Sequence, residues 1–242
     1  TYEEKGDNQL AMEEYQNIAV SSELYTNAQL QTGMILKKEG KINEAINLIK
    51  AAIKKKDAQV ALYLLLASLY EENKDTAAAE NILLEGTGIA PRSIELHYAL
   101  GVIYEKTDRL SESVKEMETV LDIDPENAEA LNFIGYSYAD RGINLKEAEA
   151  LIIRALKIKP DSGYLMDSLG WVYFKNNQLN SAEKHLKKAL ELMPDEVEIM
   201  DHLGDVYVKM KKIKDAREIF NRALKIDPQN SSIQKKLENL NR

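Results

Sequence analysis

The sequence predicts an all-α fold, a solenoid of stacked antiparallel helix pairs. The first observation behind this prediction is the spacing of the prolines, since all five follow one another at intervals of 34, 35, 34 and 34 residues. The second is that columns of small and of bulky apolar residues keep the same period. A fixed period of this length is typical of helical repeat arrays, in which each unit packs against its neighbours. The prolines are Pro91, Pro125, Pro160, Pro194 and Pro228.

The first helix of each pair is predicted from a small residue followed three positions later by a large one. Spacings of three and four residues place side chains on one helical face. The small residue therefore lets a second helix approach closely, and the large one fills the space beside it. The small column is Gly33, Ala67, Gly101, Gly135, Gly170 and Gly204, and the large column is Leu36, Tyr70, Tyr104, Tyr138, Tyr173 and Tyr207.

The second helix of each pair is predicted from another small residue followed four positions later by a bulky one. Proline cannot continue a helix and restricts the residue before it, so each proline marks the passage to the next pair. Turn-forming stretches such as 141–143 and 176–178 separate the two helices of a pair. The small column is Ala45, Ala79, Ser113, Ala148, Ala182 and Ala216, and the bulky column is Ile49, Leu83, Met117, Ile152, Leu186 and Phe220.

Together these columns resemble the tetratricopeptide repeat over essentially the whole chain. The resemblance implies a right-handed superhelical solenoid, with one extra residue in the fourth repeat that predicts an altered turn at 142–145. Residues 1–25 are predicted to be the C-terminal part of a truncated repeat, so we expect the sequence to be a piece of a longer protein. Residues 231–242 are predicted to form a capping helix. The complete repeats are 26–59, 60–93, 94–127, 128–162, 163–196 and 197–230.

Composition and charge exclude several classes of function. With 40 acidic and 32 basic residues the formal net charge is −8, which opposes binding to a nucleic-acid polyanion. The chain has no cysteine, so disulfides, thiolate metal sites and a cysteine nucleophile are excluded. It contains no Gly-rich phosphate loop and no nucleophile elbow. His202 lies beside Asp201 and Asp205, but aspartates at this spacing are typical of a solvated helix face. We therefore predict no enzyme activity, no cofactor and no metal site.

The resemblance also implies where a partner binds, because in this family the first helix of each repeat lines a concave groove. The stripe of this helix that the packing columns leave free concentrates aromatic and acidic residues in the C-terminal half of the chain. Rings give buried area and cation–π contacts, and carboxylates give charge pairing, so we expect a protein or peptide with apolar and basic side chains. The clamp of lysine, arginine and asparagine that holds acidic chaperone tails in this family is absent. The predicted groove residues are Tyr98, Asn132, Tyr136, Tyr164, Asp167, Trp171, Phe174, Asp201 and Asp205.

These observations predict a non-catalytic scaffold that binds a peptide segment or partner protein. Two alternatives remain open, namely a self-associating assembly module and a recruitment domain of a larger enzyme. The stretches 132–142, 167–173 and 201–207 are similar to those of bacterial tetratricopeptide proteins, many of which act in envelope assembly. This similarity favours a periplasmic or envelope-associated location over a cytoplasmic one. Gly86 and Gly88 predict either a hinge after the first two complete repeats or an early helix stop.

Overall fold

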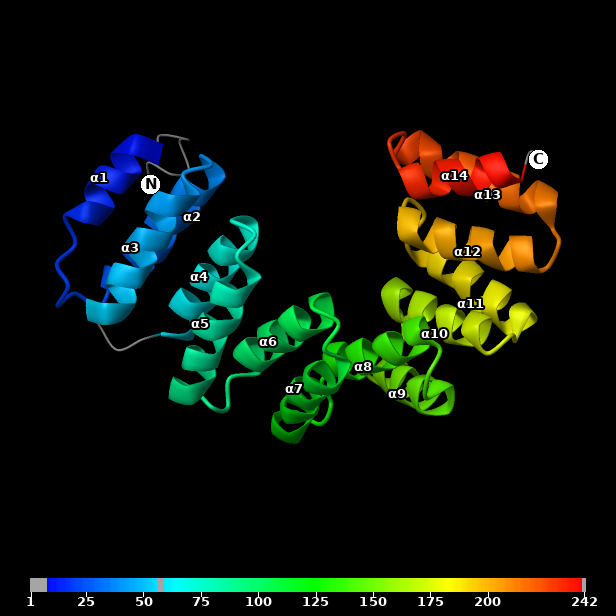
Figure 1. Cartoon of the computed structure of the whole chain (residues 1–242), viewed down its shortest axis with the longest axis horizontal. Coiled ribbons are helices and arrows are strands. Elements are labelled where there is room, and N and C mark those ends of the chain that lie inside the picture. Colours follow the sequence, from blue (N-terminus) through cyan, green and yellow to red (C-terminus); the bar gives the residue numbers. More distant parts are fainter. Residues whose placement is uncertain (1–7, 56–58, 241–242) are drawn as a thin grey trace. The chain divides into compact units, whose positions relative to one another are not determined.

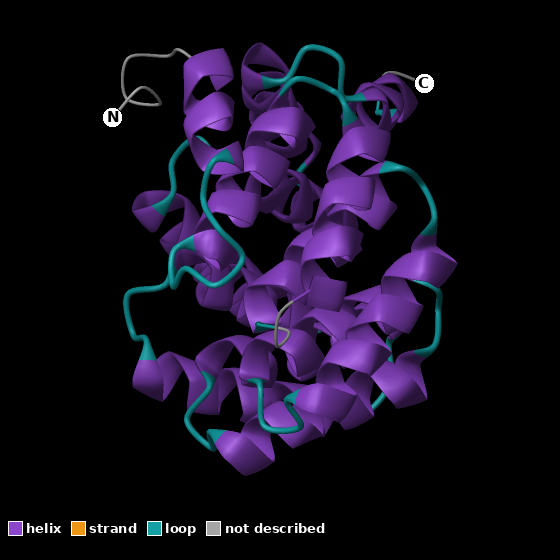
Figure 2. Cartoon of the chain, turned by 90° about the vertical axis from the view of Figure 1, so that its left-hand side faces the viewer, coloured by secondary structure: helices purple, strands orange, loops and turns teal. Residues whose placement is uncertain are grey.

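The computed structural model describes residues 8–55 and 59–240, and these form α-helices joined by short turns, with no strand among them (Figures 1 and 2). The all-α repeat fold expected from the sequence is confirmed. The chain divides into two compact units, one ending at Ile123 and the other beginning at Asp124. The helices of the first unit are α1 (Asn8–Gln16), α2 (Tyr25–Lys38), α3 (Ile42–Lys55), α4 (Val60–Glu72), α5 (Thr76–Ile89), α6 (Ile94–Lys106) and α7 (Leu110–Ile123).

The helices of both units form antiparallel pairs, such as α2 with α3 in the first unit and α8 with α9 in the second. In both units a first helix packs against the second helix of its own pair and against the second helix of the preceding pair. It also packs against the first helices of neighbouring pairs. First helices therefore lie next to one another, α2, α4 and α6 in the first unit and α8, α10 and α12 in the second. The helices of the second unit are α8 (Ala128–Arg141), α9 (Leu145–Ile158), α10 (Gly163–Lys175), α11 (Leu179–Leu192), α12 (Val197–Lys209), α13 (Ile213–Ile226) and α14 (Ser231–Asn239).

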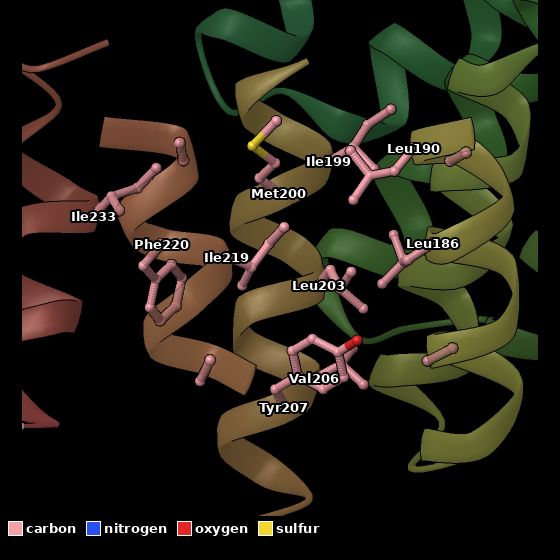
Figure 3. Packing of buried hydrophobic residues seen from close by; sticks show 14 residues of the cluster. Leu186, Leu190, Ile199, Met200, Leu203, Val206, Tyr207, Ile219, Phe220 and Ile233 are labelled. Atoms are coloured by element: carbon pink, nitrogen blue, oxygen red, sulfur yellow. The ribbon is translucent and has the colours of Figure 1, made fainter. Parts of the chain in front are cut away.

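The core between the helices is made by the small and large columns. A Cβ atom placed on Gly204 would lie 2.1 Å from Cε1 of Phe220, so only glycine allows this approach of α12 and α13. Figure 3 shows Phe220 and its neighbours Leu203, Tyr207 and Ile233 meeting between α11, α12, α13 and α14. Ile233 is 1% exposed, so α14 covers the last pair with an apolar side chain. The limits assigned to the individual repeats stay a prediction.

Each turn between the helices of a pair contains a residue with left-handed backbone. The residue after it donates its N–H to the carbonyl of the large column, as Lys212 does to Tyr207 at 2.9 Å. The fourth pair, with the extra residue, has a second left-handed residue, Asn144, at φ 47°. The left-handed residues that recur once per turn are Gly40, Lys74, Asp108, Gly142, Asn177 and Lys211.

The early helix stop predicted at Gly86 and Gly88 is wrong, because α5 continues through both to Ile89. A Cβ atom on Gly86 would lie 3.1 Å from Cδ2 of Leu96 and 3.2 Å from Cβ of Tyr63, so this glycine serves close packing. The hinge stays a prediction.

Candidate partner-binding surface

The predicted groove residues all lie on first helices, and we call their positions the first-helix stripe. In the first unit the stripe includes Tyr98 on α6. In the second unit it includes residues of three helices. These are Asn132 and Tyr136 on α8, Tyr164, Asp167, Trp171 and Phe174 on α10, and Asp201 and Asp205 on α12.

Asp167 and Trp171 hold His202 of the next first helix. Nδ1 of His202 lies 2.9 Å from Oδ1 of Asp167, and its ring stacks on Trp171 with centroids 4.2 Å apart. All three residues are buried, with 6%, 7% and 8% of Asp167, His202 and Trp171 exposed. Burial lowers the pKa of His202, but the hydrogen bond and charge of Asp167, helped by Glu198 and Asp201, outweigh it and raise the pKa overall.

Trp171 has further partners on α8 and α10. Its Nε1 donates to Oδ1 of Asp140 at 3.3 Å, and its ring stacks on Phe174 with centroids 4.9 Å apart. Nζ of Lys175 lies 4.9 Å from the Trp171 ring and donates to the Asp140 carbonyl at 2.6 Å. Nζ of Lys209 lies 4.7 Å from the Phe174 ring. The only tryptophan is therefore enclosed by groups of the chain itself.

Asp201 and Asp205 hold Lys236 of α14 in a similar way. Nζ of Lys236 lies 2.7 Å from Oδ1 of Asp201 and 2.8 Å from Oδ2 of Asp205. Burial raises the pKa of Asp205, and Lys236 opposes this effect. The solvated helix face expected for these aspartates is wrong, because both carboxylates are partly buried and paired with the lysine.

The two contacts follow one spacing rule. A stripe residue contacts the residue that lies 35 positions later in the sequence, as Asp167 contacts His202. The stripe residue one helical turn after it contacts the same side chain, which then lies 31 positions later, as His202 does for Trp171. Asp201 and Asp205 stand in these relations to Lys236. Sequence reasoning missed His202 and Lys236 as the partners of these residues, and the 31- and 35-residue spacing was the signal that identifies them.

The remaining stripe residues of the second unit are less enclosed. Tyr164 is 57% exposed, and its hydroxyl lies 3.4 Å from Oε2 of Glu196. Tyr136 is half-buried, and burial together with the carboxylates of Glu198, Asp140 and Asp167 raises its pKa. Oδ1 of Asn132 is buried and has no hydrogen-bond partner among the described residues. Tyr98 in the first unit is half-buried.

The first unit has an open cavity on its stripe, with a volume of about 770 Å³. Its walls come from the first two turns of α4, the first turn of α6 and the loop between α5 and α6. In the repeat register Ala61 and Glu95 occupy the stripe position of Tyr164, and Leu64 occupies that of Asp167. All three contribute to the cavity. The lining residues are Val60, Ala61, Leu64, Ala90, Pro91, Arg92, Ser93 and Glu95, and we call this the α4–α6 cavity.

None of the described helices is long and apolar enough to span a bilayer. Over 178 residues the chain is 33% identical to a TPR repeat-containing protein of Pseudomonas aeruginosa, a match that covers 73% of this chain and 30% of that protein. The chain thus spans less than a third of the length of this curated relative.

Solved structures of other repeat proteins share the fold. A tetratricopeptide repeat protein from Parabacteroides merdae is 18% identical with a TM-score of 0.78, covering 100% of this chain and 95% of that one. PilW, described as a widely conserved type IV pilus biogenesis factor, is 20% identical with a TM-score of 0.75, covering 89% of this chain and 100% of that one. Models of the tetratricopeptide repeat match residues 36–103, 94–127 and 173–240. This chain, with its periodic helix pairs, belongs to the tetratricopeptide repeat family.

Proposed function

We propose that this protein is a non-catalytic scaffold that binds a peptide segment or partner protein on the first-helix stripe. The tetratricopeptide fold generally mediates protein–protein interaction.

The α4–α6 cavity carries this proposal. Its volume of about 770 Å³ falls within the range of pockets that bind ligands, roughly 300–1,000 Å³. Five of its eight lining residues are Val60, Ala61, Leu64, Ala90 and Pro91, so its walls are largely apolar. Burying an apolar side chain of a partner here removes surface from water on both molecules, which favours binding.

In the second unit Tyr164 supports the same proposal. Its ring is 57% exposed on the first turn of α10 and is available as a contact for a partner. Asp167, Asp201 and Asp205, in contrast, are occupied by His202 and Lys236. A basic side chain of a partner would have to compete with these internal partners of the carboxylates, so we assign the larger share of the binding energy to apolar contacts.

We also propose a periplasmic or envelope-associated location in a bacterium. The support is the sequence similarity to bacterial tetratricopeptide proteins and the fold shared with the pilus biogenesis factor PilW.

The test is affinity capture of binding proteins from an extract of the source organism. It compares the wild type with variants substituted on the first-helix stripe and with one control variant substituted on a second helix. Ala61→Trp fills the α4–α6 cavity, and Tyr164→Ala removes the exposed ring. Ala51→Trp is the matched control, because Ala51 is exposed on the second helix α3. We expect one protein to be captured by the wild type and by Ala51→Trp, and lost or weakened with the stripe variants at unchanged helicity.

Equal capture by all four proteins would refute the stripe as the binding site. A molecular mass that rises with concentration, with no captured protein, would favour the self-associating module in its place.

A further inference from the structure

We propose that the α4–α6 cavity binds a partner segment that carries a large apolar side chain next to a side-chain carboxylate. This inference rests on the proposed function and specifies the chemistry of the partner.

The apolar part follows from the walls. Leu64 also packs against the core cluster that contains Tyr63, Leu96 and Leu100, so the inner wall of the cavity is fixed by the core. Pro91 has a restricted backbone and stiffens the opposite wall. A cavity with fixed apolar walls binds a leucine or phenylalanine side chain without having to order itself first.

The carboxylate follows from the charges at the rim. Arg92 is exposed and has no hydrogen-bond or ion-pair partner in the described part of the chain. Glu95 is the other charged lining residue, and its Oε2 accepts a hydrogen bond from Oγ of Ser93 at 2.7 Å. Ser93 holds this carboxylate at the first turn of α6, where the helix dipole offsets its negative charge.

The start of α4 adds to the positive character of the rim. The residue before it, Gln59, makes no side-chain hydrogen bond to the first turn. Val60 and Ala61 of this turn line the cavity. Arg92 with the positive end of α4 therefore complements an acidic group on the partner, and a basic group would meet Arg92 with like charge.

The experiment uses three short synthetic peptides, blocked at both ends, that differ in the residue after a central phenylalanine. This residue is aspartate, asparagine or lysine, and binding to the whole chain is followed by fluorescence anisotropy of a label. We expect the aspartate peptide to bind at least fivefold more tightly than the lysine peptide. We expect Arg92→Glu to reverse this order and Ala61→Trp to weaken all three peptides at least tenfold.

Lys184→Glu is the matched control, because it makes the same change of charge on the exposed surface of α11 in the other unit. It should leave the ratio between the peptides unchanged. Equal binding of the three peptides, lost with Ala61→Trp, would overturn the carboxylate preference and leave the proposed function standing. Absence of binding by every peptide would overturn the inference, and the capture experiment then decides the proposed function separately.

Discussion

The contact between Asp167 and His202 gives the sharpest test of how the second unit is held together. We consider Asp167→Ala, His202→Ala and the double variant. The side chains are each 8% exposed, and Nδ1 lies 2.9 Å from Oδ1, so both groups are removed from water and depend on each other. The contact joins α10 to α12, which are first helices of successive pairs.

The size of the effect follows from these values. A hydrogen bond to a charged group contributes about 1.5–3 kcal/mol to stability. Breaking a buried ion pair costs about 3–5 kcal/mol, because one charge is left buried without a partner. His202 can become neutral by releasing its proton when Asp167 is lost, so we expect a cost within the range of the hydrogen bond. We expect Asp167→Ala to destabilise the protein by about 2–3 kcal/mol. His202→Ala should cost about 3 kcal/mol, because the stacking on Trp171 is lost as well.

The assay is urea unfolding followed both by circular dichroism and by the fluorescence of Trp171, the only tryptophan. Fluorescence reports the joint between α10 and α12, and circular dichroism reports the whole chain, which matters because repeat arrays need not unfold in one step. The double-mutant cycle should give a coupling free energy of about 1.5–3 kcal/mol. Asp161→Ala, an exposed aspartate of the same unit, is the control and should change stability by less than about 0.5 kcal/mol. A coupling below about 0.5 kcal/mol would refute the reasoning.

Three further predictions concern His202, the glycines and the turns. Because the folded-state pKa of His202 is raised above its ordinary value of 6.5, its contribution to stability is full below pH 6.5 and is lost as the pH rises through the folded-state pKa. The advantage of wild type over His202→Gln in urea unfolding should therefore shrink as the pH is raised from below 6.5 into the alkaline range. Gly204→Ala should lower the free energy of unfolding by about 2–3 kcal/mol, because the added Cβ would lie 2.1 Å from the ring of Phe220. Gly88→Ala in α5 has open space around it and should raise the free energy of unfolding by about 0.5–1 kcal/mol. Equal shifts of the thermal unfolding midpoint for the two variants would contradict the packing argument. Lys74→Gly should raise the free energy of unfolding by about 0.5 kcal/mol. Glycine removes the strain of a left-handed backbone at φ 60°, and this gain exceeds the conformational freedom that glycine adds to the unfolded chain. A lower thermal unfolding midpoint for the variant would contradict this prediction.

The helix pairs were predictable from the sequence because their packing needs particular residue sizes at fixed intervals. Gly204 and Phe220 illustrate this, since α12 and α13 approach only where one residue has no side chain and the other fills the space. The left-handed turn residues were harder, because Lys74 and Lys211 carry no turn signal of their own. Their positions follow from the glycine at the corresponding place in the turn at Gly40.

The stripe was predictable in position but not in its partners. Aspartates and a tryptophan on a free helical face have the composition of a peptide-binding surface, and the same composition also suits contacts between neighbouring repeats. The two cases can be told apart for Asp167 and Trp171 only if it is known that both side chains contact His202, which lies 35 residues after the first and 31 after the second. That contact depends on how successive first helices stack. Within the described ranges Tyr164 has no such partner on its ring, and it stays 57% exposed.

The same spacing places a small residue beside the α4–α6 cavity of the first unit. The residue that lies 35 positions after Leu64 and 31 positions after Ser68 is Ala99. Its methyl group fills far less space than the side chains of His202 and Lys236, which stand in the same relation to stripe residues of the second unit. A helical side chain covers the turn that precedes it, so a longer residue at position 99 would extend toward Glu95 and the cavity. We therefore expect Ala99→Leu to weaken binding of the phenylalanine peptides at least threefold while leaving the helicity unchanged. If peptide affinity is unaffected by Ala99→Leu yet lost with Ala61→Trp, the openness of the cavity depends on the α5–α6 loop and not on the size of the side chain that joins neighbouring first helices.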